Sequence, residues 1–213
     1  MEKDKPIFRT VLRDIEIRIE EKRSVFLSVA HRAENEEAVQ AFLAARRKLY
    51  PDARHLVYAF LLENGAARYA DDSEPQGTAG MPTLEAIRRA ELSDVVVATT
   101  RYFGGILLGA GGLTRAYAAA AKAALDAAGV AEYYPFSYYV LALNYADHRK
   151  LQNEFPRYGA MEKNCDFAEN VRLTVAVPAG AGEDFCRRVV EVTAGRTIPQ
   201  PAGAGREFLP AET

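Results

Sequence analysis

The apolar run Val95-Val96-Val97-Ala98 constrains the fold more strongly than any other segment of the chain. A strand with one face in water alternates apolar and polar side chains, whereas successive apolar side chains are typical of a strand covered on both faces. We therefore expect residues 95–103 to form a strand that is buried on both sides of its sheet. The rest of the sequence must supply the elements that cover it.

The segments before this strand predict a hairpin, a helix and a third strand. Apolar and charged residues alternate over residues 11–20 and again, after a short polar turn, over residues 25–29, which is typical of an antiparallel hairpin. Apolar residues recur at helical spacing over residues 34–50, and Pro51 ends this helix. Residues 55–62 are expected to form the third strand.

Two further helices flank the apolar strand. A short helix is expected before it, over about residues 83–90, and a longer one after it, from Leu113 to Ala128. The longer segment holds nine alanines, so it can pack closely against a sheet before Gly129 ends it. The element order is not a strict βαβ alternation, and it predicts a sheet with helices on one side.

A second pattern of strands and helices follows in the last third of the chain. Its expected elements are strand Phe136–Leu143, helix Ala146–Phe155, strand Ala160–Phe167, strand Val171–Val177, helix Glu183–Val192 and strand Arg196–Pro199. This βαββαβ order predicts a ferredoxin-like domain. We therefore predict an α+β protein with two domains, residues 1–133 and residues 134–213. From Pro201 the Gly- and Ala-rich sequence predicts a loose tail, with order ending near residue 200.

Composition and charge exclude several classes of protein. The 213 residues are 49% hydrophobic and 26% charged, which is typical of a globular protein. No apolar run approaches the roughly 18 to 20 residues that span a bilayer, and the first residues do not resemble a signal peptide. We therefore expect a cytoplasmic protein with no membrane partner. The 27 Lys and Arg residues are balanced by 29 Asp and Glu residues, so no DNA sequence readout is expected.

The nucleophilic and soft metal-ligating residues form no recognisable catalytic or metal-binding motif in the sequence. Cys165 and Cys186 lie in a predicted strand and a predicted helix, without CxxC spacing or a clustered His, so reduced core thiols are expected. The three histidines lie in separate segments, and no Gly-x-Ser-x-Gly motif occurs. We therefore expect no catalytic residues, no metal ligands and no cofactor.

An acidic turn is the first of two segments that point to function. In Asp71-Asp72-Ser73-Glu74-Pro75-Gln76-Gly77-Thr78-Ala79-Gly80-Met81-Pro82, three carboxylates lie within four positions. Carboxylates of this kind hold Mg²⁺ in many proteins. Asp and Ser also favour turns and helix caps, and the Gly and Pro residues shape a loop. Because the EF-hand arrangement is missing, the turn interpretation is favoured and the cation site remains the alternative.

A glycine-rich segment between the apolar strand and the alanine-rich helix is the second. It carries Gly104, Gly105, Gly109, Gly111 and Gly112. A strand, a glycine loop and a helix amino terminus are the parts of a phosphate-binding cradle, and Arg101 and Arg115 add forked cationic donors. The Walker pattern is absent because Leu113 follows the last glycine, and the dinucleotide spacing is absent as well. A tight, close-packed crossover is the structural alternative.

Taken together, the acidic turn and Arg101–Leu113 resemble the paired signatures of the IMPACT family. Ser24-Val25-Phe26 resembles the family's hairpin element, and the tail is similar to the second domain of the bacterial YigZ-type members. The resemblance spans about Ser24 to Pro199. Ser73 stands where the family commonly has Gly, and Val25 stands where a basic residue is frequent. A residue with a Cβ atom at 73 disfavours a left-handed turn, and Val25 removes one phosphate contact.

The resemblance implies a ribosomal protein S5 domain 2-like first domain and a tail similar to the last domain of elongation factor G. Both shapes are used on RNA, and eukaryotic relatives act in translational control by binding a partner of the amino-acid-starvation kinase. We expect a non-catalytic, translation-associated regulator that binds RNA, the ribosome or a translation factor. The alternatives are a Mg²⁺-dependent enzyme acting on a phosphorylated small molecule or nucleotide and a protein-only scaffold. The binding residues are expected to be Asp71, Asp72, Glu74, Gly77, Thr78, Arg101, Tyr102, Gly104, Gly105, Gly109, Gly111, Gly112 and Arg115.

Overall fold

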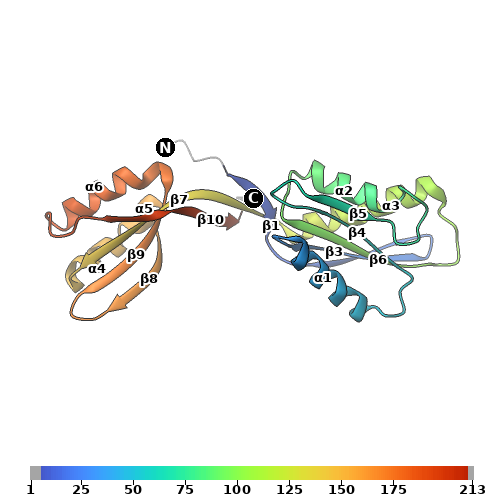
Figure 1. Cartoon of the computed structure of the whole chain (residues 1–213), viewed down its shortest axis with the longest axis horizontal. Coiled ribbons are helices and arrows are strands. Elements are labelled where there is room, and N and C mark those ends of the chain that lie inside the picture. Colours follow the sequence, from blue (N-terminus) through green and yellow to red (C-terminus); the bar gives the residue numbers. More distant parts are fainter. Residues whose placement is uncertain (1–5, 211–213) are drawn as a thin grey trace. The chain divides into compact units, whose positions relative to one another are not determined.

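The computed structural model describes residues 6–210 of the chain. These residues form two compact units, which we call the first domain (residues 8–132) and the tail domain (residues 133–209 with Ile7). Both contain a sheet and helices, so the chain is a two-domain protein of mixed α and β structure (Figure 1). Among the described residues, none of the helices combines the length and apolar character that a bilayer crossing requires.

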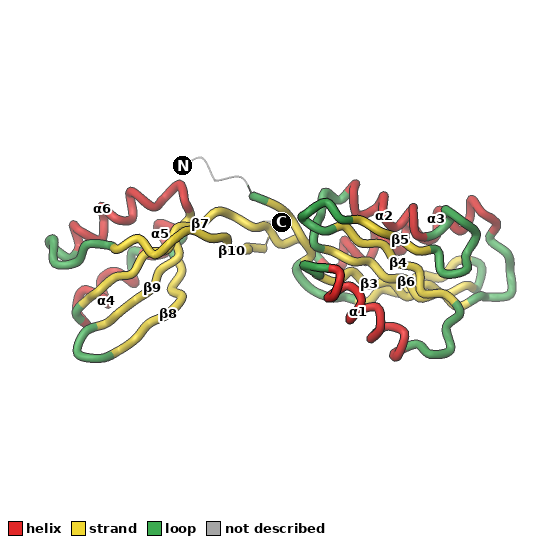
Figure 2. Tube along the Cα trace, in the orientation of Figure 1, coloured by secondary structure: helices red, strands yellow, loops and turns green. Residues whose placement is uncertain are grey.

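The first domain is built on an antiparallel five-stranded sheet in the order β2-β3-β6-β4-β5 (Figure 2). Its elements are β1 (Phe8–Val11), β2 (Glu16–Glu21), β3 (Ser24–Arg32), α1 (Glu36–Leu49), β4 (His55–Leu61), β5 (Ala67–Ala70), α2 (Gly80–Arg89), β6 (Val95–Tyr102) and α3 (Gly109–Ala128). The apolar strand β6 lies at the centre, where both of its edges are paired. Every residue of β6 from Val95 to Arg101 is buried.

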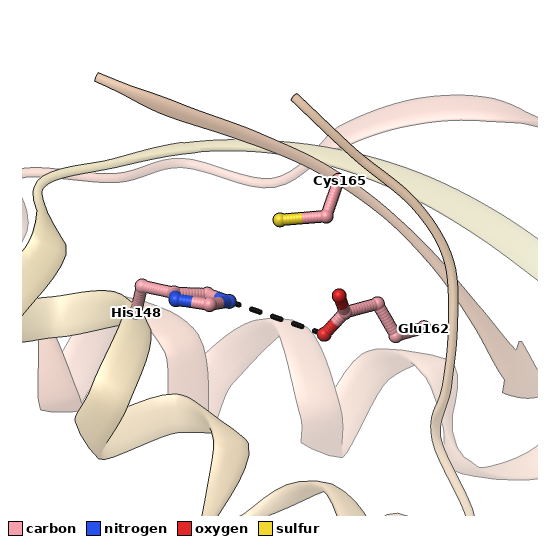
Figure 3. Close-up of side chains that lie close together, drawn as sticks. All are labelled: His148, Glu162 and Cys165. Carbon is pink, nitrogen blue, oxygen red and sulfur yellow. Dashed lines mark ion pairs between the residues drawn. The ribbon is translucent and has the colours of Figure 1, made fainter. Parts of the chain in front are cut away.

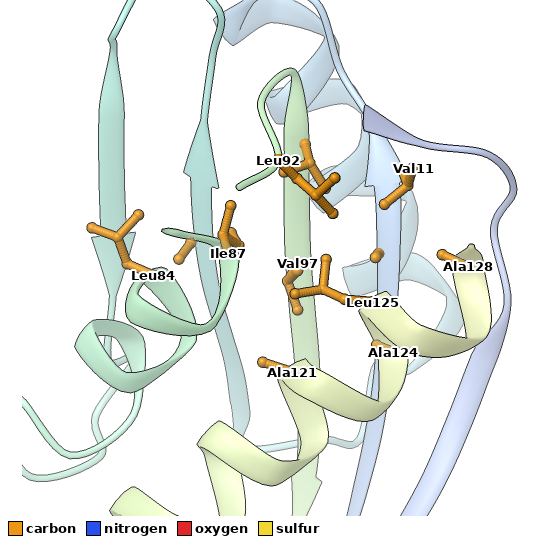
Figure 4. Packing of buried hydrophobic residues seen from close by; sticks show 12 residues of the cluster. Val11, Leu84, Ile87, Leu92, Val97, Ala121, Ala124, Leu125 and Ala128 are labelled. Carbon is orange, nitrogen blue, oxygen red and sulfur yellow. The ribbon is translucent and has the colours of Figure 1, made fainter. Parts of the chain in front are cut away.

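Helices cover both faces of this sheet, so the expectation of helices on one side is wrong. Val95 and Val97 pack with α2 and α3, as Figure 4 shows for Val97, Leu84 and Leu125. Val96 and Ala98 point the other way and pack with α1. A central strand with apolar residues at successive positions exposes hydrophobic surface unless both faces are covered. The second layer therefore follows from the same run that predicted the strand.

Local boundaries in the first domain depart from the periodicity in three places. The predicted first strand is divided into β1 and β2, and the edge strand β5 was not predicted. Helix α3 begins at Gly109, four residues before the predicted start at Leu113, so Gly109, Gly111 and Gly112 lie in its first turn. Glycine has low intrinsic helix propensity, and here the packing of the helix on the sheet outweighs it.

In the tail domain β8, β9 and β7 are neighbours in that order, both β10 and β1 also pair with β7, and the helices α4, α5 and α6 share one hydrophobic core with this sheet. Its elements are β7 (Val130–Leu143), α4 (Tyr145–Gln152), α5 (Phe155–Tyr158), β8 (Met161–Phe167), β9 (Val171–Pro178), a 3₁₀ turn (Ala179–Ala181), α6 (Gly182–Val192) and β10 (Gln200–Pro210). The core contains Leu141 of β7, Leu173 of β9 and Phe185 of α6. The predicted helix over residues 146–155 is divided into α4 and α5.

The end of the described chain is a strand, so the predicted loose tail from Pro201 is wrong. The predicted strand Arg196–Pro199 is also absent. Instead, β10 starts at Gln200, directly after the predicted strand ends, and pairs with β7. A Cβ atom on Gly205 would lie 2.6 Å from Cε2 of Tyr138, so glycine permits the close approach. The Tyr138 hydroxyl donates to Glu207 at 2.9 Å. Burial and this carboxylate raise the pKa of Tyr138.

A chain that ends after Pro199 tests the contribution of β10. We expect the tail domain to melt at least about 5 °C lower, because β7 loses a paired neighbour and Tyr138 loses its cover. Hydrogen exchange followed by mass spectrometry should show faster exchange over residues 136–143. Amides of β6 serve as the internal control and should keep their protection. Equal protection of β7 in both chains would contradict this role.

Candidate functional site

Glu74 is the centre of a buried polar network that joins the acidic turn to β6 and α3. Its carboxylate accepts hydrogen bonds from Nη1 of Arg101 at 2.7 and 2.9 Å and from the Tyr117 hydroxyl at 2.7 Å. Arg101 is only 5% exposed. Burial, followed by the charge of Glu74, raises the pKa of Tyr117 far above its usual range, so the hydroxyl stays protonated and donates.

Ser24 extends this network to the hairpin β2–β3. Its Oγ accepts a hydrogen bond from Nη2 of Arg101 at 3.3 Å and one from the amide of Gly104 at 3.2 Å. A Cβ atom on Gly104 would lie 2.0 Å from the carbonyl carbon of Arg23, so only glycine fits there. The start of the glycine-rich segment is therefore held against the hairpin.

Asp71 fixes the start of helix α2. Its carboxylate accepts hydrogen bonds from the amides of Gly77, Ala79 and Gly80 at 2.8, 3.0 and 2.8 Å. Unpaired amides at a helix amino terminus favour a negative charge of this kind. The hydroxyl of Thr78 donates to the Pro75 carbonyl at 2.6 Å and closes the same turn.

Asp72 ties the acidic turn to strand β4. Its carboxylate accepts the amide of Leu56 at 2.7 Å and lies 3.6 Å from Nη1 of Arg47. Asp72 and Ser73 adopt φ angles of 43° and 70°, so the left-handed turn forms even though Ser73 carries a Cβ atom. Such a conformation persists where the surrounding contacts enforce it.

The arrangement favours the turn interpretation of the acidic segment over the cation site. Asp71 is occupied by backbone amides, Asp72 by an amide and Arg47, and Glu74 by Arg101 and Tyr117. A cation held by these carboxylates would displace hydrogen bonds that hold the domain together. The three residues therefore act as structural anchors of the neighbouring segments.

The glycine-rich segment presents an exposed surface beside this buried network. We define the crossover surface as Lys22, Arg23, Phe103, Ile106, Leu107 and Arg115. Phe103 is 51% exposed and Leu107 is 83% exposed, which is unusual for large apolar side chains in one short segment. Gly105 and Gly109 adopt φ angles of 83° and 72°, which favour glycine.

The charges of the crossover surface are all cationic. Lys22, Arg23 and Arg115 are exposed, and within residues 6–210 they make no ion pair or side-chain hydrogen bond. Arg115 lies over the first turn of α3, with Nη1 3.5 Å from the position of a Cβ atom on Gly111. Among the residues that the structure describes, no side chain caps the amino terminus of this helix. Unpaired cations and unoccupied helix amides suit an anionic partner.

Arg101 and Tyr102 do not contribute to this surface, although both were expected to contact a ligand. Arg101 is buried because the carboxylate of Glu74 holds its guanidinium in the interior. Successive residues of a strand point to opposite faces, and the Tyr102 hydroxyl donates to Asp52 at 2.9 Å. Arg101 therefore positions the glycine-rich segment from the interior of the domain.

Several members of the site escaped the sequence analysis. The predicted set of binding residues lacks Ser24, Tyr117, Lys22, Arg23 and Phe103, although Ser24 and Phe103 lie in segments that carry the family resemblance. Tyr117 lies on the buried face of the alanine-rich helix, which was expected only to pack against the sheet. A polar hydroxyl on that face is a signal for a buried acceptor, since a buried Tyr usually has a hydrogen-bond partner.

The Glu74–Arg101 pair should show strong energetic coupling. We expect Glu74→Gln or Arg101→Met alone to lower the free energy of unfolding by about 3–5 kcal/mol, because each leaves the other polar group uncompensated in the interior. The double variant should lose much less than the sum of the two. Urea denaturation of the natural chain, the two single variants and the double variant measures this coupling.

An exposed ion pair of the same domain provides the control for this cycle. Arg68 and Glu36 lie 2.9 Å apart, with side chains 65% and 41% exposed. Arg68→Met should change the free energy of unfolding by less than about 1 kcal/mol. Additive losses at Glu74 and Arg101 would show that the buried pair does not act as a unit.

Known proteins match this chain across both domains. Residues 22–125 match the family model described as the Impact N-terminal domain, and residues 141–196 match a domain of unknown function, DUF1949. A solved structure described as the crystal structure of a hypothetical protein is 27% identical to this chain, with a TM-score of 0.59. The alignment covers 96% of this chain and 97% of that one.

Two bacterial relatives align with most of the sequence. IMPACT family member YvyE of Bacillus subtilis is 34% identical over 184 residues, which are 85% of this chain and 84% of that protein. IMPACT family member YigZ of Escherichia coli is 30% identical over 178 residues, which are 82% of this chain and 87% of that protein. With the signatures in the acidic turn and the glycine-rich segment, these matches place the chain in the IMPACT family.

Proposed function

We propose that this protein is a non-catalytic, translation-associated regulator that binds RNA, the ribosome or a translation factor. The binding site is the crossover surface of its first domain. The observation that carries the proposal is the exposed ring of Phe103, on a segment that approaches the backbone of Arg23 at Gly104 and leads into the helix that carries Arg115. Cations contact phosphates, and an exposed ring stacks on an unpaired base. The helix amides of Gly109, Gly111 and Gly112 add donors for a phosphate.

The buried network makes this surface suitable for recognition. Ser24 holds the start of the glycine-rich segment, and Tyr117 ties the α3 end to Glu74, so little conformational entropy is lost when a partner binds. Arg115 projects from the second turn of a 20-residue helix and reaches back to Gly111, which fixes its position relative to the glycines. In this proposal Arg101 positions the surface, and Lys22, Arg23 and Arg115 make the contacts.

The folds of both domains are consistent with an RNA-associated role. We propose that the first domain is S5 domain 2-like and that the tail is ferredoxin-like and similar to the last domain of elongation factor G. The tail's strand order β10-β7-β9-β8 supports the second assignment. Because the whole chain carries a net charge of −2, the attraction is local and the affinity should be modest and salt-sensitive.

Charge removal at the crossover surface tests the proposal. We expect Lys22→Gln/Arg115→Gln to weaken binding to purified bacterial ribosomes on the order of tenfold at low salt, because two phosphate contacts are lost. The slope of log affinity against log salt concentration should become shallower by roughly 1 to 2. Sedimentation and fluorescence anisotropy with a labelled RNA hairpin provide the two measurements.

A charge-matched variant separates a specific surface from overall charge. Lys48 and Arg89 are exposed cations of the same domain, one at the end of α1 and one at the end of α2. Lys48→Gln/Arg89→Gln changes the net charge equally and should bind like the natural chain. Equal loss in both variants, or no ribosome binding at low salt, would remove the proposal.

A protein-only partner is the second candidate, and the exposure of Ile106 and Leu107 favours it. Exposed apolar side chains that lie next to one another are typical of protein interfaces. Treatment of a cell extract with nuclease before affinity capture separates the two candidates. RNA-dependent partners are lost after nuclease treatment, whereas a protein partner that contacts Leu107 remains and is lost in Leu107→Ser.

A Mg²⁺-dependent enzyme remains the alternative of another class. The occupied carboxylates of Asp71, Asp72 and Glu74 weigh against it. We expect Mg²⁺ to leave the melting temperature of the first domain unchanged to within about 1 °C, with or without a nucleotide, because binding of a ligand to the folded state raises it. A saturable rise that is abolished by Asp71→Asn would favour the enzyme.

A further inference from the structure

Three side chains of the tail domain bring soft and hard metal-ligand atoms together. An imidazole nitrogen of His148, a carboxylate oxygen of Glu162 and the Sγ atom of Cys165 all lie within 4.8 Å of one another. His148 comes from α4, whereas Glu162 and Cys165 come from β8, and Figure 3 shows the three side chains converging on one space. Among the described residues this is the one such group of three ligands.

A bulge in β8 makes the convergence possible. Residues three apart in a regular strand point to opposite faces, so Glu162 and Cys165 would not meet. The register shifts between Glu162 and Asn164, and Glu162 pairs with Val175 while Cys165 pairs with Leu173. Both partners on β9 belong to the helix-facing core. The extra residue, Lys163, thus turns both ligands toward α4.

His148 presents an unsatisfied nitrogen to this space. The residue is 7% exposed, and its Nε2 atom has no hydrogen-bond partner within the described chain. The nearest carboxylate oxygen, Oε2 of Glu162, lies 3.9 Å away, which is beyond hydrogen-bond distance. The ring meets the edge of Phe167 at a centroid distance of 5.8 Å. A buried polar atom without a partner requires an explanation, and one such explanation is that the atom binds an ion.

We propose that His148, Glu162 and Cys165 form a binding site for a divalent transition metal ion of the Zn²⁺ class. Imidazole nitrogen, thiolate sulfur and carboxylate oxygen all bind Zn²⁺, at about 2.0–2.3 Å. The side-chain atoms need to close by only about an ångström to reach that shell. Hard ions such as Mg²⁺ are disfavoured, because sulfur and nitrogen are poor ligands for them.

The site is open to solvent on the side of Glu162. The side chain of Glu162 is 36% exposed, and β8 is the edge strand of its sheet. Three protein ligands with an open position leave room for water or for a donor from a partner. The site lies wholly within the tail domain, so it does not depend on the proposed function of the crossover surface.

Co²⁺ substitution provides a direct test, because thiolate ligation produces a sulfur-to-cobalt charge-transfer band in the near ultraviolet. We expect the reduced chain to bind one Co²⁺ with this band and to exchange it for Zn²⁺. Cys165→Ser should abolish the band. His148→Gln and Glu162→Gln should weaken Zn²⁺ binding at least tenfold in competition with a chromogenic chelator. Zn²⁺ should also raise the melting temperature of the tail domain.

Two variants at residues outside the site serve as controls. Cys186 is the other thiol of the tail domain, and His31 is a half-buried imidazole on the first domain paired with Asp14. Cys186→Ala and His31→Gln should bind like the natural chain. Circular dichroism of each metal-free variant checks folding, and if Cys165→Ser fails to fold, His148→Gln and Glu162→Gln carry the test.

Three results would overturn the site. The first is a reduced natural chain that shows no charge-transfer band with Co²⁺. The second is equal loss of the band in Cys165→Ser and Cys186→Ala. The third is unchanged Zn²⁺ affinity in a folded His148→Gln chain, which would leave His148 and Glu162 as an ion pair formed only when the imidazole is protonated.

Discussion

The buried ion pair of Glu74 and Arg101 is the constraint on which the first domain depends. Charges in the interior are stabilised when they are paired and hydrogen-bonded, and Tyr117 and Ser24 add hydrogen bonds to this pair, although Nε of Arg101 has no partner within the described residues. The four residues come from the acidic turn, β6, α3 and β3, so a single network fixes the relative positions of these elements. The two family signatures meet in the interior, and the exposed surface is a consequence of how they are held.

This arrangement separates structural from recognition roles among residues that look alike in the sequence. The three carboxylates of the acidic turn are occupied by amides, Arg47, Arg101 and Tyr117, which leaves the turn without free anionic groups for a ligand. The cations around the glycine-rich segment have no partners of this kind within the described residues. Attraction is therefore concentrated at the crossover surface of a chain whose overall charge is close to neutral.

The tail domain carries chemistry of a different type. Its sheet places a bulged edge strand beside α4, and the bulge brings Glu162 and Cys165 to the same side as His148. Edge strands tolerate bulges because only one of their sides is paired. An ion held there would join α4 to β8, two elements that otherwise meet through the packing of aromatic rings. The two proposed sites thus lie on separate units.

The sequence by itself determined the central strand, the hairpin, the main helices and the family, because hydrophobic periodicity and motif spacing are local properties. It did not determine β10, since glycine-rich composition suggests a loose tail unless β7 is known to supply the hydrogen bonds. Arg101 and Arg115 were equivalent candidates, and only the tertiary structure buried one on Glu74 and exposed the other. The ligand cluster at His148 depended on a one-residue register shift. Burial and register are set by contacts between distant segments, and for that reason they were decided only by the folded chain.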